Sequence, residues 1–358
     1  MAQFGKWSKT NIFHGFTFIG IILTLVLIAP SRPADFVPLY NGAVAVREHR
    51  NPFDRRVVEQ NQRDVYGRLA VAGEDEFRGG YPVPALFLGL PLTVLPIGAA
   101  SVVYRVFSAT LLVLALVRLG VKPLWAFVVL FLLREPVVAF TLGQFTLWTS
   151  ACAVFALSAL QRQQDTRAAL WFALASGTLI LTVPLAFLML LARRRALLIY
   201  IGVMGLWSGV SFLTSGWWVA EWLEILRAYP GYVKFMIWMP TVLPIVIPVG
   251  IFAVIMALRK HDMMRRWAFA VSGIVLLLPL SGLYHMTLFA PVFVRYSRSL
   301  VLVIGVCVWA LSLAPLELRL LTVPLVFTGV TLVDNLYTPA WRKPLTSLIA
   351  RDANLEAD

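Results

Sequence analysis

The sequence predicts an all-α, polytopic membrane protein. Of its 358 residues, 59% are hydrophobic, and the mean hydropathy is +0.80. Apolar runs of spanning length, about 20 residues, recur along the chain, and polar residues gather between them. We expect a single integral-membrane domain over residues 1–340 with ten to twelve crossings. A short cytoplasmic tail, residues 341–358, is too small to fold alone.

The first apolar segment, Asn11 to Pro30, is expected to be a retained membrane helix. It follows the basic stretch Lys6 to Lys9 and lacks the clear small-residue cleavage site of a signal peptide. Proline within later runs (Pro91, Pro136, Pro184) is typical of broken or re-entrant helices. The further spans are expected near 82–97, 99–118, 124–142, 144–160, 168–192, 196–214, 241–258, 267–281, 283–297, 299–314 and 316–333.

Basic residues mark the ends of the predicted helices. A net charge of +13 would indicate nucleic acid in a soluble protein. Here the charge lies in clusters between apolar runs, as the positive-inside rule expects of cytoplasmic loops, so no nucleic-acid partner is predicted. The clusters are Arg193–Arg195, Arg259–Arg266 and Arg342–Lys343.

Two polar segments are expected to share the opposite, extracytoplasmic face. Residues 31–80 form the first outer loop and contain eight of the eighteen Asp and Glu residues. Residues 215–240 form the second, whose four tryptophans (Trp217, Trp218, Trp222 and Trp238) suit a membrane interface. Within the first loop, Val37 to Arg47 can be helical, and its stripe of Leu39, Ala43 and Val46 is typical of a helix lying in the interface.

No metal or cofactor site is predicted. Cys152 and Cys307 lie in apolar runs without zinc spacing, and the four histidines are scattered. No DxD pair, of the kind that holds a metal-bound nucleotide sugar, occurs in the outer loops. We therefore expect no nucleotide donor and no cofactor.

Four motifs follow one another in an order that resembles glycosyltransferase family 87, also described as DUF2029. They are "ADFVPLYNGAVAVREHRNPFD", "YPVPALFLGLPLTVLP", Gly143-Gln144 in "TLGQFTLWTS", and "PLSGLYHMTLFAP" with His285. The resemblance covers roughly residues 10–300. That family comprises polyprenol-phosphate-dependent mannosyltransferases and many uncharacterised relatives.

The resemblance implies a C-type glycosyltransferase (GT-C) fold in a plasma membrane, with interfacial helices in the first outer loop. It also implies a lipid-linked sugar donor, with a glycolipid or glycan as acceptor. The family's catalytic carboxylate follows the first membrane helix, where Asp35 stands here. A carboxylate there can accept the proton of the acceptor hydroxyl, and one suffices for an inverting displacement. The alternative is an exposed Asp35 that caps the next helix.

The leaving phosphate needs cationic or hydrogen-bonding partners. Candidates on the outer face are Arg78 beside Tyr81, Arg227, Lys234 and His285; each is also explained as a helix-end anchor or a solvated charge. Gln144 is a candidate for a sugar hydroxyl, although we favour a structural role, in which Gly143 permits a close turn and the glutamine satisfies freed backbone.

One further carboxylate and two departures from the family bear on function. Glu135 is an acidic residue in an apolar stretch, which makes it a functional candidate, and Arg134 beside it is an uncertain partner. Many members carry lysine where Val183 precedes Pro184, and a second histidine is common where Met286 stands. These departures weaken the implication of a mannosyl donor.

The sequence leaves other functions open. A transporter or flippase of lipid-linked sugars would also use broken helices and a carboxylate at membrane depth, but no internal repeat is visible. A non-catalytic membrane scaffold is a third alternative. An oligosaccharyltransferase is disfavoured, because such enzymes usually append a large soluble domain.

Overall fold

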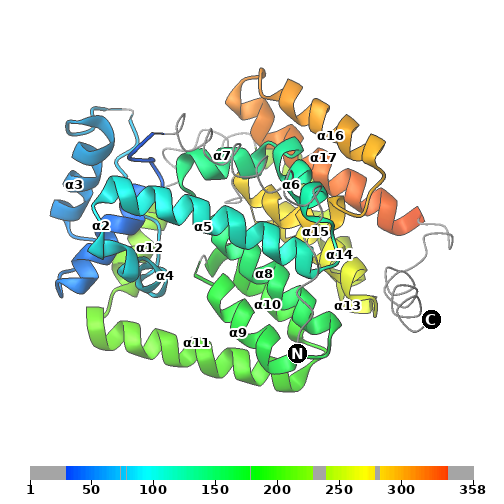
Figure 1. Cartoon of the computed structure of the whole chain (residues 1–358), viewed down its shortest axis with the longest axis horizontal. Coiled ribbons are helices and arrows are strands. Elements are labelled where there is room, and N and C mark those ends of the chain that lie inside the picture. The colour runs from blue at the N-terminus through cyan, green and yellow to red at the C-terminus, as the bar shows by residue number, and fades with distance from the viewer. Residues whose placement is uncertain are drawn as a thin grey trace, which may run out of the picture.

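The computed structural model describes residues 30–72, 74–77, 79–177, 179–228, 239–278 and 283–337. Over these residues the chain is helical without any strand (Figure 1). The predicted first span and the predicted C-terminal tail lie outside the described residues, apart from Pro30.

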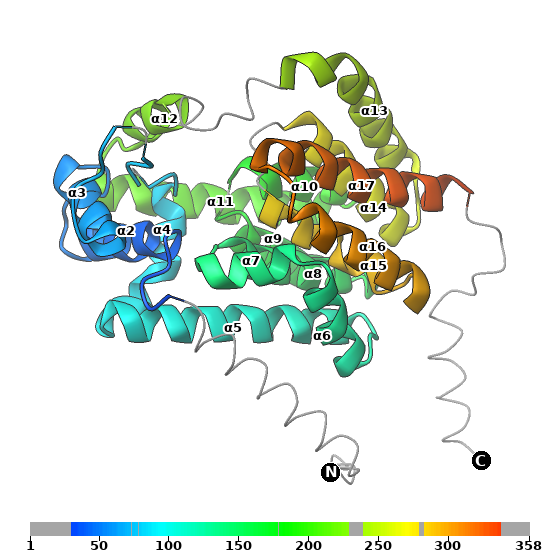
Figure 2. The same cartoon turned by 90° about the horizontal axis from the view of Figure 1, so that it is seen from above.

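The first polar loop is an ordered, helical unit. It contains α2 (Phe36–Arg47) and α3 (Arg55–Tyr66), and it leads into α4 (Val83–Gly89), which continues as the 3-10 helix η1 (Leu90–Val94). The Asp54 carboxylate caps α3 by accepting from the backbone N–H of Arg56. These short helices pack on one another, as Figure 2 shows at one end of the molecule.

Helix α2 is confirmed, but its setting differs from the prediction. The stripe of Leu39, Ala43 and Val46 is buried against protein, and Val37 and Ala45 on other sides of the helix are buried as well. The interfacial placement is therefore wrong for α2, because α3, α4 and η1 cover the surface that was expected to meet lipid.

Two long helices connect the same two ends of the molecule in opposite directions. Helix α5 (Ile97–Arg118) starts beside the first loop, where Ser101 Oγ donates to Ser31 O at 2.9 Å. Helix α11 (Arg194–Ser215) starts in an arginine cluster and ends where Trp218 Nε1 donates to Ser211 Oγ at 3.0 Å. Trp218 packs in the same buried cluster as Phe36 of α2.

The remaining helices fill the space between and beside these two. In Figure 1, α8, α9 and α10 lie between α5 and α11. A large core surrounds α8 and α14, in which Trp267 is fully buried. The bounds are α6 (Pro123–Leu132), α7 (Glu135–Leu142), α8 (Thr146–Gln161), α9 (Asp165–Ala175), α10 (Leu179–Leu190), α12 (Val219–Ala228), α13 (Met239–Arg259), α14 (Met263–Leu277), η4 (Leu283–Phe289), α15 (Ala290–Phe293), α16 (Arg298–Leu311) and α17 (Leu316–Tyr337).

Within the described residues, two helices are long and apolar enough to cross a membrane, namely α5 and α11, and a third span arises if α6 and α7 count as one. The expected ten to twelve crossings are not confirmed. The run 124–142 is bent by 83° between α6 and α7, and the run 168–192 is two helices, α9 and α10. Other apolar helices, or the described stretches of them, are 10–17 residues long, among them residues 246–259 of α13 and 322–336 of α17.

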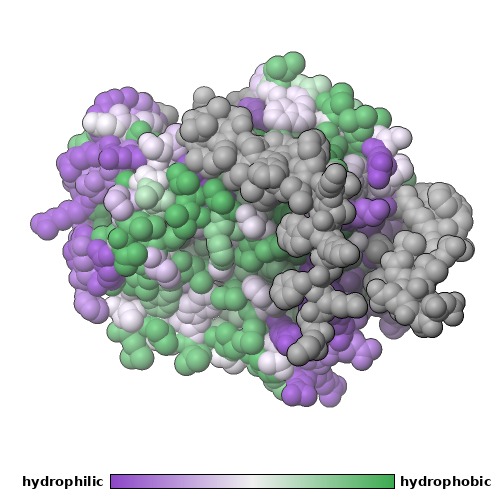
Figure 3. Space-filling view, viewed as in Figure 1, coloured by the Kyte–Doolittle hydropathy of each residue, from purple (hydrophilic) through white to green (hydrophobic). Residues whose placement is uncertain are grey.

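The long helices carry much of the exposed apolar surface. Phe107 and Leu114 on α5, and Leu206 and Leu213 on α11, are more than half exposed. Figure 3 shows hydrophobic residues over the middle of the molecule, with hydrophilic residues gathered over α3 at the left and again at the lower right. Exposed apolar surface between two polar ends is the distribution expected of a membrane protein.

Candidate functional site

Asp35 is fixed in place through both of its backbone groups. Its N–H donates to Leu142 O at the end of α7 (3.1 Å), and its carbonyl accepts from the Tyr81 hydroxyl (3.1 Å). Segments from three parts of the chain therefore meet at this residue. Tyr81, which the sequence placed among the substrate-binding candidates, is one of them.

The Asp35 side chain does not cap α2, although the residue occupies the N-cap position. It is hydrogen-bonded to the Gln144 side chain instead. Burial raises the pKa of the carboxyl to about 7; the Gln144 hydrogen bond acts in the opposite direction, and the charge of Asp75 adds to the rise. A carboxyl with this pKa holds and releases a proton near neutral pH, as a general base must.

Gly143 makes the approach of Asp35 to Gln144 possible. Its φ is +67°, and a Cβ at this position would lie 2.7 Å from Phe36 Cβ and 3.1 Å from Pro33 Cβ. The predicted close turn is confirmed. The expected bond to a freed backbone carbonyl is made by the Gln144 backbone N–H, which donates to Ala139 O at 2.8 Å. The Gln144 side-chain amide is therefore available to Asp35.

Aromatic residues enclose this junction. The rings of Tyr104 and Phe145 are parallel, with centroids 6.4 Å apart. The centroid of the Tyr104 ring also lies 5.2 Å from that of the Phe36 ring. The Tyr104 hydroxyl reaches the carbonyl oxygen of Gln144 at 3.5 Å. Tyr81 meets Phe145 edge-on at 5.9 Å. Tyr104 was not predicted, because a tyrosine inside an apolar run carries no distinct sequence signal.

Next to Tyr104, α5 carries a buried cation. Arg105 is 1% exposed, its Nε donates to Ser101 O at 3.2 Å, and its guanidinium carbon lies 5.6 Å from the centre of the Phe140 ring. Among the described residues, neither terminal nitrogen has a hydrogen-bond partner. A buried guanidinium without a carboxylate is costly, which makes it a candidate for an anionic ligand. The sequence signal was a lone arginine inside an apolar run.

The other predicted substrate residues are only partly placed. Arg78 and Lys234 lie outside the described residues. Arg227 belongs to α12, but its side chain is likewise not described. His285 lies on η4, which packs against α7 and α8, the pair of helices joined at Gln144.

The two polar loops do share one end of the molecule. Trp222 Nε1 donates to Gly80 O at 3.0 Å, and Asn51 Nδ2 donates to Glu221 Oε2 at 2.7 Å. A cavity of about 730 Å³ lies between α3 and α12 and is lined by carboxylates from both, among them Glu59 and Glu224. The predicted proximity of the loops is confirmed.

Glu135 is paired with its neighbour. It is fully buried at the start of α7, and Arg134 Nη1 lies 3.3 Å from Glu135 Oε1. Adjacent residues on a regular helix diverge, but Arg134 has a φ of +50° at the break between α6 and α7, and this turns the two side chains together.

No group of three or more His, Cys, Asp or Glu side chains in the described part of the chain has the geometry to hold a metal ion. No family model, curated protein or solved structure matches this chain. The geometry around Asp35, and not a relative, therefore carries the functional argument.

We expect Gly143→Ala to destabilise the protein. The left-handed backbone alone costs about 1–2 kcal/mol for a residue with a Cβ, and the contact with Phe36 adds to that. The melting temperature of the detergent-purified chain measures the effect. Gly209→Ala is the control, because a Cβ at Gly209 meets nothing within 4 Å. Equal melting temperatures for Gly143→Ala and the wild type would contradict the packing described here.

The pKa of Asp35 also predicts how stability depends on pH. Since the pKa rises from 3.8 to about 7 on folding, the carboxyl destabilises the folded chain increasingly as pH rises through this range. Asp35→Asn removes that loss, so its melting temperature relative to the wild type should increase from pH 5 to pH 8. Glu48→Gln, an exposed carboxylate at the other end of α2, is the control. A relative melting temperature that falls over this range would show that the pKa is not raised.

Proposed function

We propose that this chain is an integral-membrane glycosyltransferase of the GT-C type, which transfers a sugar from a polyprenyl-phosphate donor to an extracytoplasmic acceptor. Mannose is the first sugar to test. The observation that carries the proposal is Asp35, a carboxyl with a pKa of about 7, held by Leu142, Tyr81 and Gln144 at the join of the first loop and the helical bundle.

The proposed reaction uses Asp35 as the general base. Its carboxylate accepts the proton of the acceptor hydroxyl while the hydroxyl oxygen attacks the anomeric carbon, and the bond from that carbon to the lipid phosphate breaks with inversion. Gln144 orients the carboxylate. Negative charge grows on the leaving phosphate, and a cation in a water-poor site stabilises it strongly. Arg105 is the candidate cation that the structure adds to the predicted His285, Arg78, Arg227 and Lys234.

Charge supports an outer location for Asp35. The end of the molecule opposite the first loop is rich in arginine: α5 ends at Arg118, α11 begins at Arg194, and Arg193 is close enough to Arg266 for their charges to repel. The first loop holds eight arginines as well, but eight acidic residues accompany them, and ion pairs such as Arg32–Asp64 and Arg55–Glu59 join the two kinds. The positive-inside rule favours a cytoplasmic location for the end whose arginines outnumber its acidic residues, and this supports an outer location for the first loop.

A transporter of lipid-linked sugars is the second candidate. The observation that favours it is the 83° bend between α6 and α7, with buried Glu135 at the break. Glu135 Oε2 has no hydrogen-bond partner among the described residues. A broken helix with a carboxylate at membrane depth is a recurring feature of transporters.

The proposed orientation predicts which residues are accessible from outside the cell. In a Cys307→Ser background, a thiol placed at exposed Glu48 should react with a membrane-impermeant maleimide on intact cells. A thiol placed at exposed Arg195 should react only after the membrane is opened. Labelling of position 195 but not 48 on intact cells would reverse the orientation and remove the extracytoplasmic site.

Transfer of radiolabelled mannose from polyprenyl-phosphate mannose tests the activity. Membranes that contain the wild-type chain, Asp35→Asn or Glu48→Gln are supplied with endogenous lipids as acceptors, and the abundance of each chain is matched. Loss of a general base costs about 10²–10⁴-fold in rate, so we expect Asp35→Asn to lose at least about 10²-fold and Glu48→Gln to retain activity.

Equal transfer by Asp35→Asn and wild type would remove Asp35 from the mechanism. A wild-type chain that moves the labelled donor lipid across the membrane without transferring the sugar would favour the transporter.

A further inference from the structure

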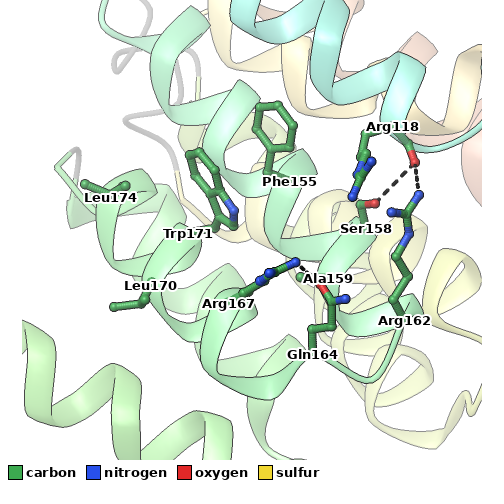
Figure 4. A pocket seen from close by; sticks show the side chains of 10 residues that line it. All are labelled: Arg118, Phe155, Ser158, Ala159, Arg162, Gln164, Arg167, Leu170, Trp171 and Leu174. Atoms are coloured by element: carbon green, nitrogen blue, oxygen red, sulfur yellow. Dashed lines mark hydrogen bonds between the residues drawn. The ribbon is translucent and has the colours of Figure 1, made fainter. Parts of the chain in front are cut away.

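A basic cavity lies at the end of the molecule opposite Asp35. It has a volume of about 480 Å³ and opens between the last turn of α5, the end of α8 and the start of α9. Figure 4 shows Arg118, Arg162 and Arg167 around one part of it. No carboxylate lines the cavity. The nearby Asp165 lies 3.8 Å from Arg193, on the side of α11.

The arginines are held in place without being neutralised. Arg162 Nη2 donates to Arg118 O at 2.9 Å, and Arg167 Nη1 donates to Gln164 Oε1 at 3.2 Å. Both acceptors are uncharged. Within the described part of the chain, the Arg118 guanidinium forms no hydrogen bond or ion pair. Each guanidinium carries five N–H donors, so most of the donors in this group remain available to an anion.

The other part of the cavity is apolar. The rings of Phe155 and Trp171 stack with centroids 4.7 Å apart, and Leu170 and Leu174 continue this wall along α9. Leu170 is 45% exposed. The cavity thus joins a cationic part to an apolar part. An inorganic anion or a free phosphate ester would use only the first of these, whereas a phospholipid presents a phosphate and an acyl chain together.

The position of the cavity fits the headgroup level of a bilayer. Arg118 ends α5, about 26 Å along the helix from Ser101, which contacts the first loop. That length is close to the hydrocarbon thickness of a bilayer. The cytoplasmic leaflet is the one that carries anionic lipids, and basic pockets between helices on that side bind their headgroups.

We propose that this cavity binds an anionic phospholipid of the cytoplasmic leaflet, with the phosphate held by Arg118 and Arg167 and an acyl chain against Leu170 and Trp171. Arg162 supports the site by its hydrogen bond to the Arg118 carbonyl. The inference rests on the proposed membrane orientation but not on glycosyl transfer, so a chain without transferase activity would bind the lipid equally well.

Native mass spectrometry of the full chain in detergent tests the proposal, with phosphatidylglycerol, phosphatidylcholine or inorganic phosphate added. The wild type should retain phosphatidylglycerol in preference to phosphatidylcholine. The double variant Arg118→Gln, Arg167→Gln should bind phosphatidylglycerol roughly tenfold more weakly or worse. The control, Arg194→Gln with Arg195→Gln, removes two exposed charges outside the cavity and should bind like the wild type.

Three results would overturn the proposal. Equal weakening in the control would show general attraction of lipid to a basic surface. Binding of inorganic phosphate that competes with the lipid and is lost in the double variant would identify a site for soluble anions. If the wild type bound phosphatidylglycerol and phosphatidylcholine equally well, the cavity would not be a site for anionic phospholipid. Matched melting temperatures of the two double variants ensure that a binding loss does not come from unfolding.

Discussion

The packing of the chain before α2 against the turn at Gly143 is the constraint on which the candidate site depends. Asp35 can reach Gln144 only because a residue without a Cβ lies under Pro33 and Phe36. The same approach lets the Asp35 N–H pair with the Leu142 carbonyl, a group that the end of α7 leaves without a helical partner. The segment that carries the candidate base thus supplies the hydrogen-bond donor for this carbonyl. Burial of the Asp35 carboxyl at the same place raises its pKa.

This contact also organises the larger structure. It fixes α2 against the bundle, and α2 in turn supports α3, α4 and the tryptophans that precede and begin α12. The first loop is therefore a folded cap on one end of α5 and α11, while arginines gather at their other end. The two sites discussed above, around Asp35 and around Arg118, lie at the two ends of one helix of spanning length.

Hydropathy predicted where the helices lie but not which of them are continuous. The runs 99–118 and 196–214 are single helices, as expected, whereas 124–142 turns sharply at Arg134 and 168–192 is interrupted near Gly177. An average of hydropathy over a run does not detect the positive φ of Arg134, so a bent run and a straight run can have the same mean hydropathy.

Site residues that lie in short sequence motifs could be predicted, whereas those that depend on packing between distant helices could not. Asp35, Tyr81 and Gln144 stood in recognisable motifs, and the structure brings them together. Tyr104 and Arg105 were missed because their role comes from packing between α5, α7 and α8, which no short sequence pattern records. The role of Asp35 is tested most directly by a structure of the full chain with a polyprenyl-phosphate sugar bound. The proposed mechanism predicts that the anomeric carbon lies on the Asp35 and Gln144 side of the bundle and that the phosphate lies near Arg105. A donor bound elsewhere, with Asp35 away from the sugar, would contradict it.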